Sequence, residues 1–181
     1  MKTDSDLTIL ILSSDHYQPI IKVWEKYFLK HWSDCPFKVV SVCNYEHYDS
    51  KVIDFKTTNI EPQPDASHFK GMLLHALDKI DTKYILYMCE DQIFVKDVIT
   101  DNFKQAISYM DKNDITKIRC LSMPEPDIDL ETEEGVINNE NFGLISLDNE
   151  YRNSLQAAIW NKDRFIELLS SRESVFSGWV L

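Results

Sequence analysis

Short apolar runs alternate with longer stretches of helical spacing over most of the chain. The runs at 7–12 and 84–89 are almost wholly apolar, which is typical of strands covered on both faces of a parallel sheet. Weaker or β-branched runs predict further strands at 37–43, 51–55, 117–122, 142–147 and 154–160. Apolar residues spaced three or four positions apart predict helices that begin near Pro19, Ser67, Ile99 and Asn161. This alternation predicts an α/β fold in which helices flank the sheet.

The segment 123–141 differs from the rest of the chain in composition. It contains Pro124, Pro126, Gly135 and many acidic residues, which is typical of a surface loop. The sequence has no internal repeat, Gly/Ser-rich linker or low-complexity stretch that would mark a domain boundary. At 181 residues it is long enough for one hydrophobic core and short for two. We therefore predict a single domain over 1–181, with an acidic loop at 123–141.

The net charge of -11 limits the partners of the protein. Such a charge repels the phosphates of nucleic acids and anionic membrane surfaces, and no basic patch interrupts it. The apolar run at 7–12 is too short for a signal peptide or a transmembrane helix. We therefore expect a cytoplasmic protein that has no transmembrane segment and binds no nucleic acid.

Several common catalytic motifs are absent from the sequence. It has no GxxxxGK[ST] phosphate loop, no GxGxxG motif and no GxSxG elbow, and its histidines lack the HExxH spacing. The cysteines form no CxxC pair, which argues against a zinc knuckle or a redox motif. These absences disfavour P-loop NTPases, Rossmann dehydrogenases, α/β-hydrolases and zinc proteases.

The most informative feature is the tripeptide Glu90-Asp91-Gln92. It follows an apolar strand directly and is followed by the hydrophobic residues 93–95, so the two carboxylates are held at the edge of the core. In an open α/β sheet, ligands bind at the carboxyl ends of the strands. Acidic residues at that edge can hold a divalent cation against a diphosphate. The pair therefore predicts a ligand site at this end of the sheet.

At these residues the sequence resembles the GT-A glycosyltransferases. The strand that ends in Leu-Tyr-Met-Cys-Glu-Asp-Gln, 86–92, looks like their DxD-bearing strand, and 8–15 looks like their first, nucleotide-contacting strand. The segment 154–160 is similar to the acceptor-side strand of bacterial members that build surface polysaccharides. The resemblance spans nearly the whole chain and implies a GT-A (Rossmann-like) mixed sheet flanked by helices.

The resemblance implies a nucleotide-sugar donor and a glycan or lipid-linked acceptor. Ser13, Ser14 and Asp15 are then donor-site residues, because their loop offers hydroxyls, backbone N–H groups and a carboxylate just before a helix. Glu90 and Asp91 are expected to contact the ribose or the diphosphate. Asp91 is also the expected ligand of a divalent metal, Mn²⁺ or Mg²⁺.

On the acceptor side, the resemblance implies roles for Gln156 and Trp160, and Trp179 is a candidate to stack on an acceptor sugar. Similar proteins continue past the last helix into a segment with a Trp and acids near the acceptor, whereas this sequence ends at Leu181. The nearest candidate for a catalytic acid is Glu173. No residue is assigned as the base that would deprotonate the acceptor.

Two alternatives to a glycosyltransferase follow from the residues. Gln92 stands where the usual motif has its second acid, and an amide is a poorer ligand for Mg²⁺ or Mn²⁺ than a carboxylate. This favours a non-catalytic or truncated GT-A-like module that binds a nucleotide sugar. An unrelated nucleotide-binding regulatory domain with a flavodoxin-like sheet is the second alternative.

Overall fold

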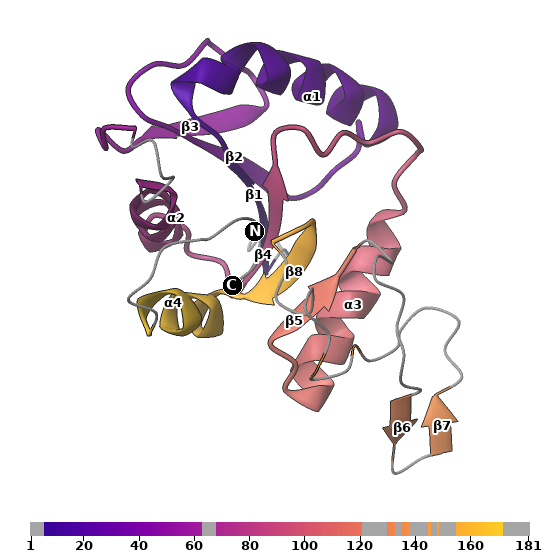
Figure 1. The fold of residues 1–181 in the computed structure, drawn as a ribbon. Coiled ribbons are helices and arrows are strands. Elements are labelled where there is room, and N and C mark those ends of the chain that lie inside the picture. Colours follow the sequence, from indigo (N-terminus) through magenta and orange to yellow (C-terminus); the bar gives the residue numbers. More distant parts are fainter. Residues whose placement is uncertain are drawn as a thin grey trace.

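The computed structural model describes residues 6–62, 68–120 and 155–171, with Ile145, Asp148 and the backbone of 130–132 and 135–137. Its strands are β1 (Leu7–Leu12), β2 (Lys38–Cys43), β3 (Ile53–Thr57), β4 (Tyr84–Cys89), β5 (Lys117–Arg119), β6 (Leu130–Thr132), β7 (Gly135–Ile137) and β8 (Ala158–Asn161). Its helices are the short 3₁₀ helix η1 (Asp15–Tyr17) and the α-helices α1 (Gln18–His31), α2 (His68–Asp78), α3 (Thr100–Asn113) and α4 (Lys162–Ser170) (Figure 1).

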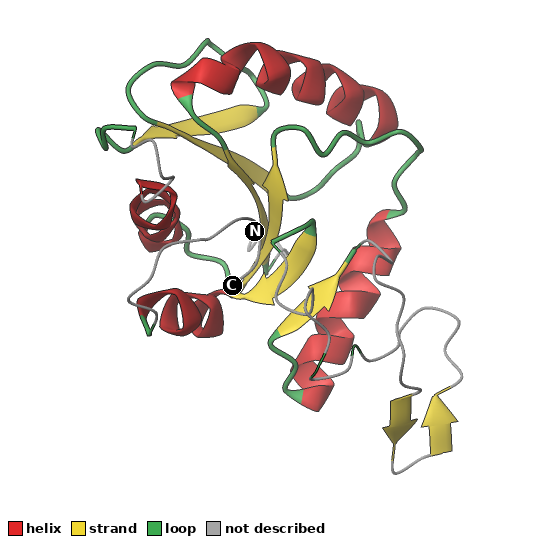
Figure 2. Ribbon diagram, in the orientation of Figure 1, coloured by secondary structure: helices red, strands yellow, loops and turns green. Residues whose placement is uncertain are grey.

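A six-stranded sheet with the order β3-β2-β1-β4-β8-β5 forms the centre of the molecule (Figure 2). The strands β3, β2, β1 and β4 are parallel, whereas β8 is antiparallel to both β4 and β5. The chain thus adds β2 and β3 on one side of β1 and then places β4 on the other side. The predicted fold class, a mixed α/β sheet flanked by helices, is confirmed.

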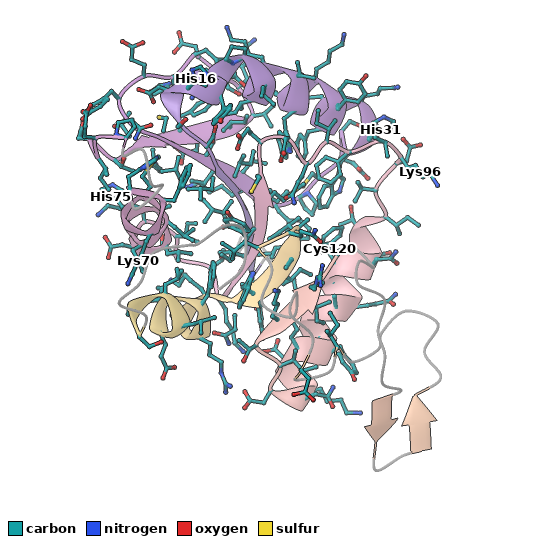
Figure 3. The ribbon with its side chains drawn as sticks, viewed as in Figure 1. His16, His31, Lys70, His75, Lys96 and Cys120 are labelled. Carbon is teal, nitrogen blue, oxygen red and sulfur yellow. The ribbon has the colours of Figure 1, made fainter. Side chains whose placement is uncertain are left out.

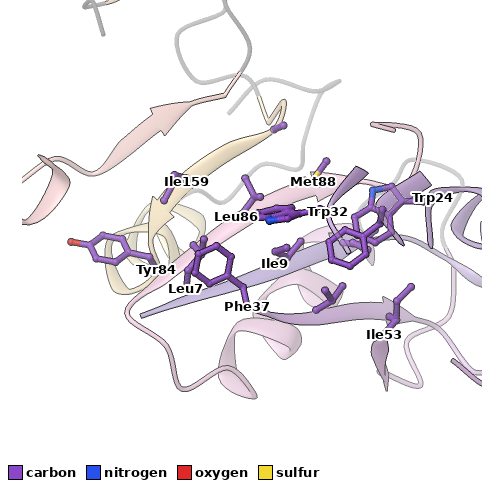
Figure 4. Close-up of a cluster of buried hydrophobic side chains, with 14 of the residues drawn as sticks. Leu7, Ile9, Trp24, Trp32, Phe37, Ile53, Tyr84, Leu86, Met88 and Ile159 are labelled. Atoms are coloured by element: carbon purple, nitrogen blue, oxygen red, sulfur yellow. The ribbon is translucent and has the colours of Figure 1, made fainter. Parts of the chain in front are cut away.

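Helices cover both faces of this sheet. Under α1 and α3, the side chains of Ile9 and Leu86 belong to a core cluster that includes Trp24 and Met110 (Figure 4). On the opposite face, α2 and α4 pack on a second cluster that includes Leu10. Successive side chains of a strand point to opposite faces, so a central strand with a helix layer on each side is expected to be largely apolar. Every residue of β1 and of β4 is accordingly buried.

An aromatic cluster fastens the segment after β4 to α1. The ring of Phe94 lies 5.7 Å from Trp24, 6.0 Å from Phe28 and 5.8 Å from Trp32, measured between centroids. The backbone N–H of Val98 donates to the carbonyl of His31 at 2.9 Å. Edge-on and tilted ring pairs at these distances are favourable beyond their burial alone. The cluster therefore fixes the course of the chain that begins with the acidic pair.

The element boundaries differ from the predictions where strands are short. The strand predicted at 51–55 lies at 53–57, and the one predicted at 154–160 is the four-residue β8, which pairs with β4 only from Tyr84 to Tyr87. The strand at 117–122 is described only as β5, up to Arg119. The prediction of a loop throughout 123–141 is wrong in part, because β6 and β7 pair there as an antiparallel hairpin.

Other predictions of helix ends have mixed outcomes. Asn161 caps α4 as expected, because its side-chain oxygen accepts from the backbone N–H of Arg164 at 3.2 Å. The predicted cap at Ser67 and nearly all of the strand at 142–147 lie outside the described residues.

Of the helices in the described part of the chain, none has the length and apolar character needed to cross a membrane.

A hydrogen bond from Trp32 to the first residue of α3 gives a test of this arrangement. The buried indole Nε1 donates to Thr100 Oγ1 at 2.8 Å. We expect Thr100→Val to lower the free energy of unfolding by about 1–3 kcal/mol, because the buried N–H loses its acceptor. Thr100→Ser keeps the hydroxyl and is the matched control. Urea unfolding of both variants measures the difference, and a Thr100→Val variant as stable as wild type would contradict the role of this hydrogen bond.

Candidate functional site at the carboxyl edge of the sheet

The switch in strand order beside β1 marks the place where a ligand is expected. From β1 the chain turns to β2 on one side, while β4 pairs with β1 on the other. In open α/β sheets, ligands bind outside the carboxyl ends of the strands at such a point. Leu12 and Cys89 are partners in the pairing of β1 with β4. Ser13 and Glu90, the next residues of the two segments, therefore emerge at the same edge.

The two serines after β1 are buried at this edge. Ser13 is 1% exposed, and its hydroxyl donates to the carbonyl of Ser14 at 3.4 Å, a long and weak contact. Ser14 occupies the cap position of η1 with extended backbone, yet its side chain makes no capping hydrogen bond. The hydroxyl of Ser14 is therefore not committed to capping the helix that follows.

Asp15 holds two loops of this edge together. Its carboxylate accepts the backbone N–H groups of Asn44 at 2.8 Å, of Tyr45 at 3.0 and 3.1 Å, and of Glu46 at 3.1 Å. Successive N–H groups that converge on one anion form a nest, which stabilises negative charge. Both oxygens of Asp15 are thus engaged in joining the loop after β1 to the loop after β2. Its role as a donor-site residue stays a prediction.

Glu90 is a buried carboxylate beside an exposed one. It is 9% exposed, whereas the neighbouring Asp91 is exposed. Burial, and to a smaller degree the charge of Asp91, raises the pKa of Glu90 above its ordinary value. The folded protein therefore holds unfavourable negative charge at the carboxyl end of β4. Perturbed carboxylates of this kind are common at functional sites.

Gln92 closes the turn that follows β4. Its side-chain oxygen accepts the backbone N–H of Cys89 at 2.8 Å, and its own backbone N–H donates to the carbonyl of Cys89 at 3.1 Å. The residue at the position of the usual second acid thus has a local structural contact. Its side-chain oxygen is engaged by the backbone of the strand end.

The two acceptor-side residues near β8 lie in different environments. Gln156 lies at the carboxyl edge, where its Oε1 accepts from Arg119 Nη2 at 2.6 Å. Trp160 pairs with Ile85 within the sheet and is 1% exposed, with its ring stacked on Phe165 at 4.3 Å. Trp160 thus belongs to the core, because its apolar ring fills the space under α4. The structure gives it no exposed face to offer a sugar.

Arg119 is a site residue that the sequence did not single out. It ends β5, at the same edge as the acidic pair, and it contacts Gln156 across the sheet. A cation at this edge suits the phosphates of a nucleotide. The only signal in the sequence is a positive charge within the strand predicted at 117–122. Glu173 and Trp179, the remaining predicted site residues, lie outside the described part of the chain.

The histidines do not assemble into a site. His16 lies near the start of α1, His31 at its end and His75 on α2 (Figure 3). Within the described residues, no group of three or more His, Cys, Asp or Glu side chains could hold a metal ion.

Comparisons with known proteins support the fold. No family model matches the chain, and a search of curated proteins finds no match. Among solved structures, the bifunctional IspDF from Campylobacter jejuni aligns with 96% of this chain and 45% of its own, with 14% identity and a TM-score of 0.50. S. aureus TarS 1-349 aligns with 90% of this chain and 48% of its own, with 12% identity and a TM-score of 0.52. The chain thus spans less than half of each of these two structures, and the likeness is one of fold.

The pKa of Glu90 gives a test of its place at the site. A carboxyl group whose folded pKa is raised stabilises the fold below its unfolded pKa, near 4.5, and this contribution is lost as the pH rises through the folded pKa. We therefore expect Glu90→Gln to raise the free energy of unfolding at pH 7 by roughly 0.5–2 kcal/mol, as for other unfavourable functional charges. The gain should vanish below pH 4.5, where Glu90 is protonated in both states. Thermal unfolding across this pH range measures it, and a loss of stability at pH 7 would contradict the assignment.

Proposed function

We propose that the chain is a glycosyltransferase that moves a sugar from a nucleotide-sugar donor to a glycan or lipid-linked acceptor in surface polysaccharide biosynthesis. One observation carries the proposal. The pairing of β1 with β4 brings Ser13 and Ser14 to the same edge as the buried Glu90 and the exposed Asp91. This edge joins hydroxyl groups, a helix start and carboxylates at the switch point of an α/β sheet.

The polar and charged groups at this edge suit a nucleotide donor. The loop before α1 offers hydroxyl groups and the first N–H groups of helical turns, which suit phosphate oxygens. Asp91, being exposed, is able to accept hydrogen bonds from ribose hydroxyls. Arg119 adds a positive charge at the far side of the same edge. Together these groups match a nucleoside diphosphate more closely than an uncharged ligand.

A divalent cation, Mn²⁺ or Mg²⁺, fits the carboxylates present. Glu90 and Asp91 supply two oxygen ligands, and Mg²⁺ commonly takes only one or two protein carboxylates with substrate phosphates and water. A cation would also offset the unfavourable charge of the buried Glu90, whose pKa burial raises. Such an ion, when bound, neutralises the charge that grows on the leaving nucleoside diphosphate. The protein groups orient the donor and hold its diphosphate at the edge of the sheet.

A non-catalytic module that binds a nucleotide sugar is the second candidate, and Gln92 favours it. The side chain of Gln92 is used by the backbone of Cys89, so the acidic motif has one fewer available ligand. This candidate keeps donor binding and lacks transfer. Assays of sugar transfer and of donor hydrolysis with protein that binds the donor separate the two.

Ligand-induced stabilisation tests the donor site directly. We expect at least one of UDP, CDP, GDP and ADP, with Mn²⁺ present, to raise the melting temperature, because a ligand that binds only the folded state stabilises it. At a ligand concentration of about one hundred times Kd, the stabilisation is about 2.7 kcal/mol. A thermal shift screen with and without Mn²⁺ measures this. No shift with any nucleotide would contradict both candidates.

The carboxylate of Asp91 gives a sharper test of the binding mode. We expect Asp91→Asn to weaken nucleotide binding by about 1–3 kcal/mol while hardly changing the stability of the free protein, because this exposed side chain loses only its charge. Asp34→Asn is the matched control, since Asp34 is exposed and lies before β2, at the opposite edge of the sheet. Titration calorimetry and thermal unfolding of both variants measure the two quantities. Lost stability with unchanged affinity would make Asp91 a turn residue.

A further inference from the structure

A carboxamide at the start of α1 lacks the hydrogen bonds that its position requires. Gln18 is the first residue of α1 and lies three positions before Ile21, which is fully buried. Residues three apart share a helix face, so Gln18 faces the sheet from the first turn of the helix. Both polar atoms of its side chain, Oε1 and Nε2, are inaccessible and have no hydrogen-bond partner.

An unpaired buried amide is unfavourable, and native structures contain few of them. Trp24, Ser41 and Trp160 also have an unpaired buried polar atom, but these three residues lie wholly within the core. Gln18 differs because the residue is partly exposed and offers a donor and an acceptor together. Its location, directly after the loop that follows β1, is the carboxyl edge of the sheet. The amide is therefore placed for a ligand that arrives there.

Neighbouring polar groups at this edge are already engaged. The Asp15 carboxylate accepts three successive backbone N–H groups. The Asn44 side chain is fully buried, donates to the carbonyl of Ile60 at 2.7 Å, and accepts from the backbone N–H of Asp15 at 3.4 Å. Among the side chains of Asp15, Asn44 and Gln18, only that of Gln18 has both a donor and an acceptor without a hydrogen bond.

We propose that the Gln18 carboxamide hydrogen-bonds the edge of the donor's nucleobase, an inference that rests on the nucleotide-binding function proposed above. Every nucleobase presents a donor or acceptor beside a second polar atom on its pairing edge, and a carboxamide matches such a pair with its own N–H and oxygen. The side chain has three rotatable bonds, so a change of rotamer brings the amide from its buried position to the ligand. Binding then supplies the hydrogen bonds that the free protein lacks.

Removal of the amide at constant shape tests the base contact. We expect Gln18→Met to leave the free protein at least as stable as wild type, because an unpaired buried polar group is lost. Its Kd for the nucleoside diphosphate preferred among UDP, CDP, GDP and ADP should rise about ten-fold or more. Its Kd for inorganic pyrophosphate, which has no base, should stay unchanged. Gln105→Met on the exposed side of α3 is the matched control.

A second variant keeps the side chain's length and replaces the amide by a carboxylate. Gln18→Glu presents acceptors alone, so we expect its Kd for the preferred nucleoside diphosphate to rise about ten-fold or more, because the acceptor on the pairing edge of the base then loses the amide N–H. An unchanged Kd in this variant, or nucleotide affinities of Gln18→Met equal to wild type, would overturn the inference. An equal loss of pyrophosphate binding in Gln18→Met would overturn it too, by showing a general structural role. Wild-type protein that binds no nucleotide would contradict the proposed function itself, and this inference with it.

Discussion

The parallel pairing of β1 with β4 is the constraint on which the candidate site depends. The chain extends the sheet to one side of β1 through β2 and β3 and then returns to the other side as β4. Parallel strands end at the same edge, so residues far apart in the sequence, Ser13 and Glu90, emerge together. Helices on both faces allow this pairing because both strands are largely apolar. The polar groups therefore begin where each strand ends, and the site follows from the burial of the strands.

Two different interactions then fix the segments that leave this edge. On the β2 side, the Asp15 carboxylate satisfies three backbone N–H groups and binds two loops together by hydrogen bonds. On the β4 side, the rings around Phe94 hold the chain against α1 by apolar packing. The first is electrostatic and the second is hydrophobic, yet both restrict loop motion. A site on such restrained segments loses less conformational entropy when a ligand binds.

The parts predicted best from the sequence are those determined by local pattern. The apolar runs became β1 and β4 with the predicted bounds, because a strand buried on both faces is apolar at nearly every position. The bounds of β8 were shifted, because β8 extends only as far as its pairing with neighbouring strands allows. The placement of Glu90 and Asp91 at the strand end followed from the same local pattern. The contacts of Asp15 did not, because its partners lie some thirty positions further along the chain.

The difference between local pattern and contacts that form only in the folded chain also explains which residues the sequence analysis misjudged or missed. Trp160 sits in a strand near the predicted site, but its neighbour in space, Phe165, places it in the core. Gln18 has an ordinary sequence context at the start of a helix, and only the absence of a partner in three dimensions marks it. Burial and pairing of polar atoms are properties of the folded chain, so pattern alone does not reveal them.

Gln92 shows how structure and chemistry compete for one position. An acid there would complete the usual motif, but the present side chain closes the turn by accepting the N–H of Cys89. That N–H belongs to a strand end that is buried, where an unpaired donor is costly. The glutamine thus stabilises the turn that presents Glu90 and Asp91, and its side-chain oxygen is committed to the backbone of that turn.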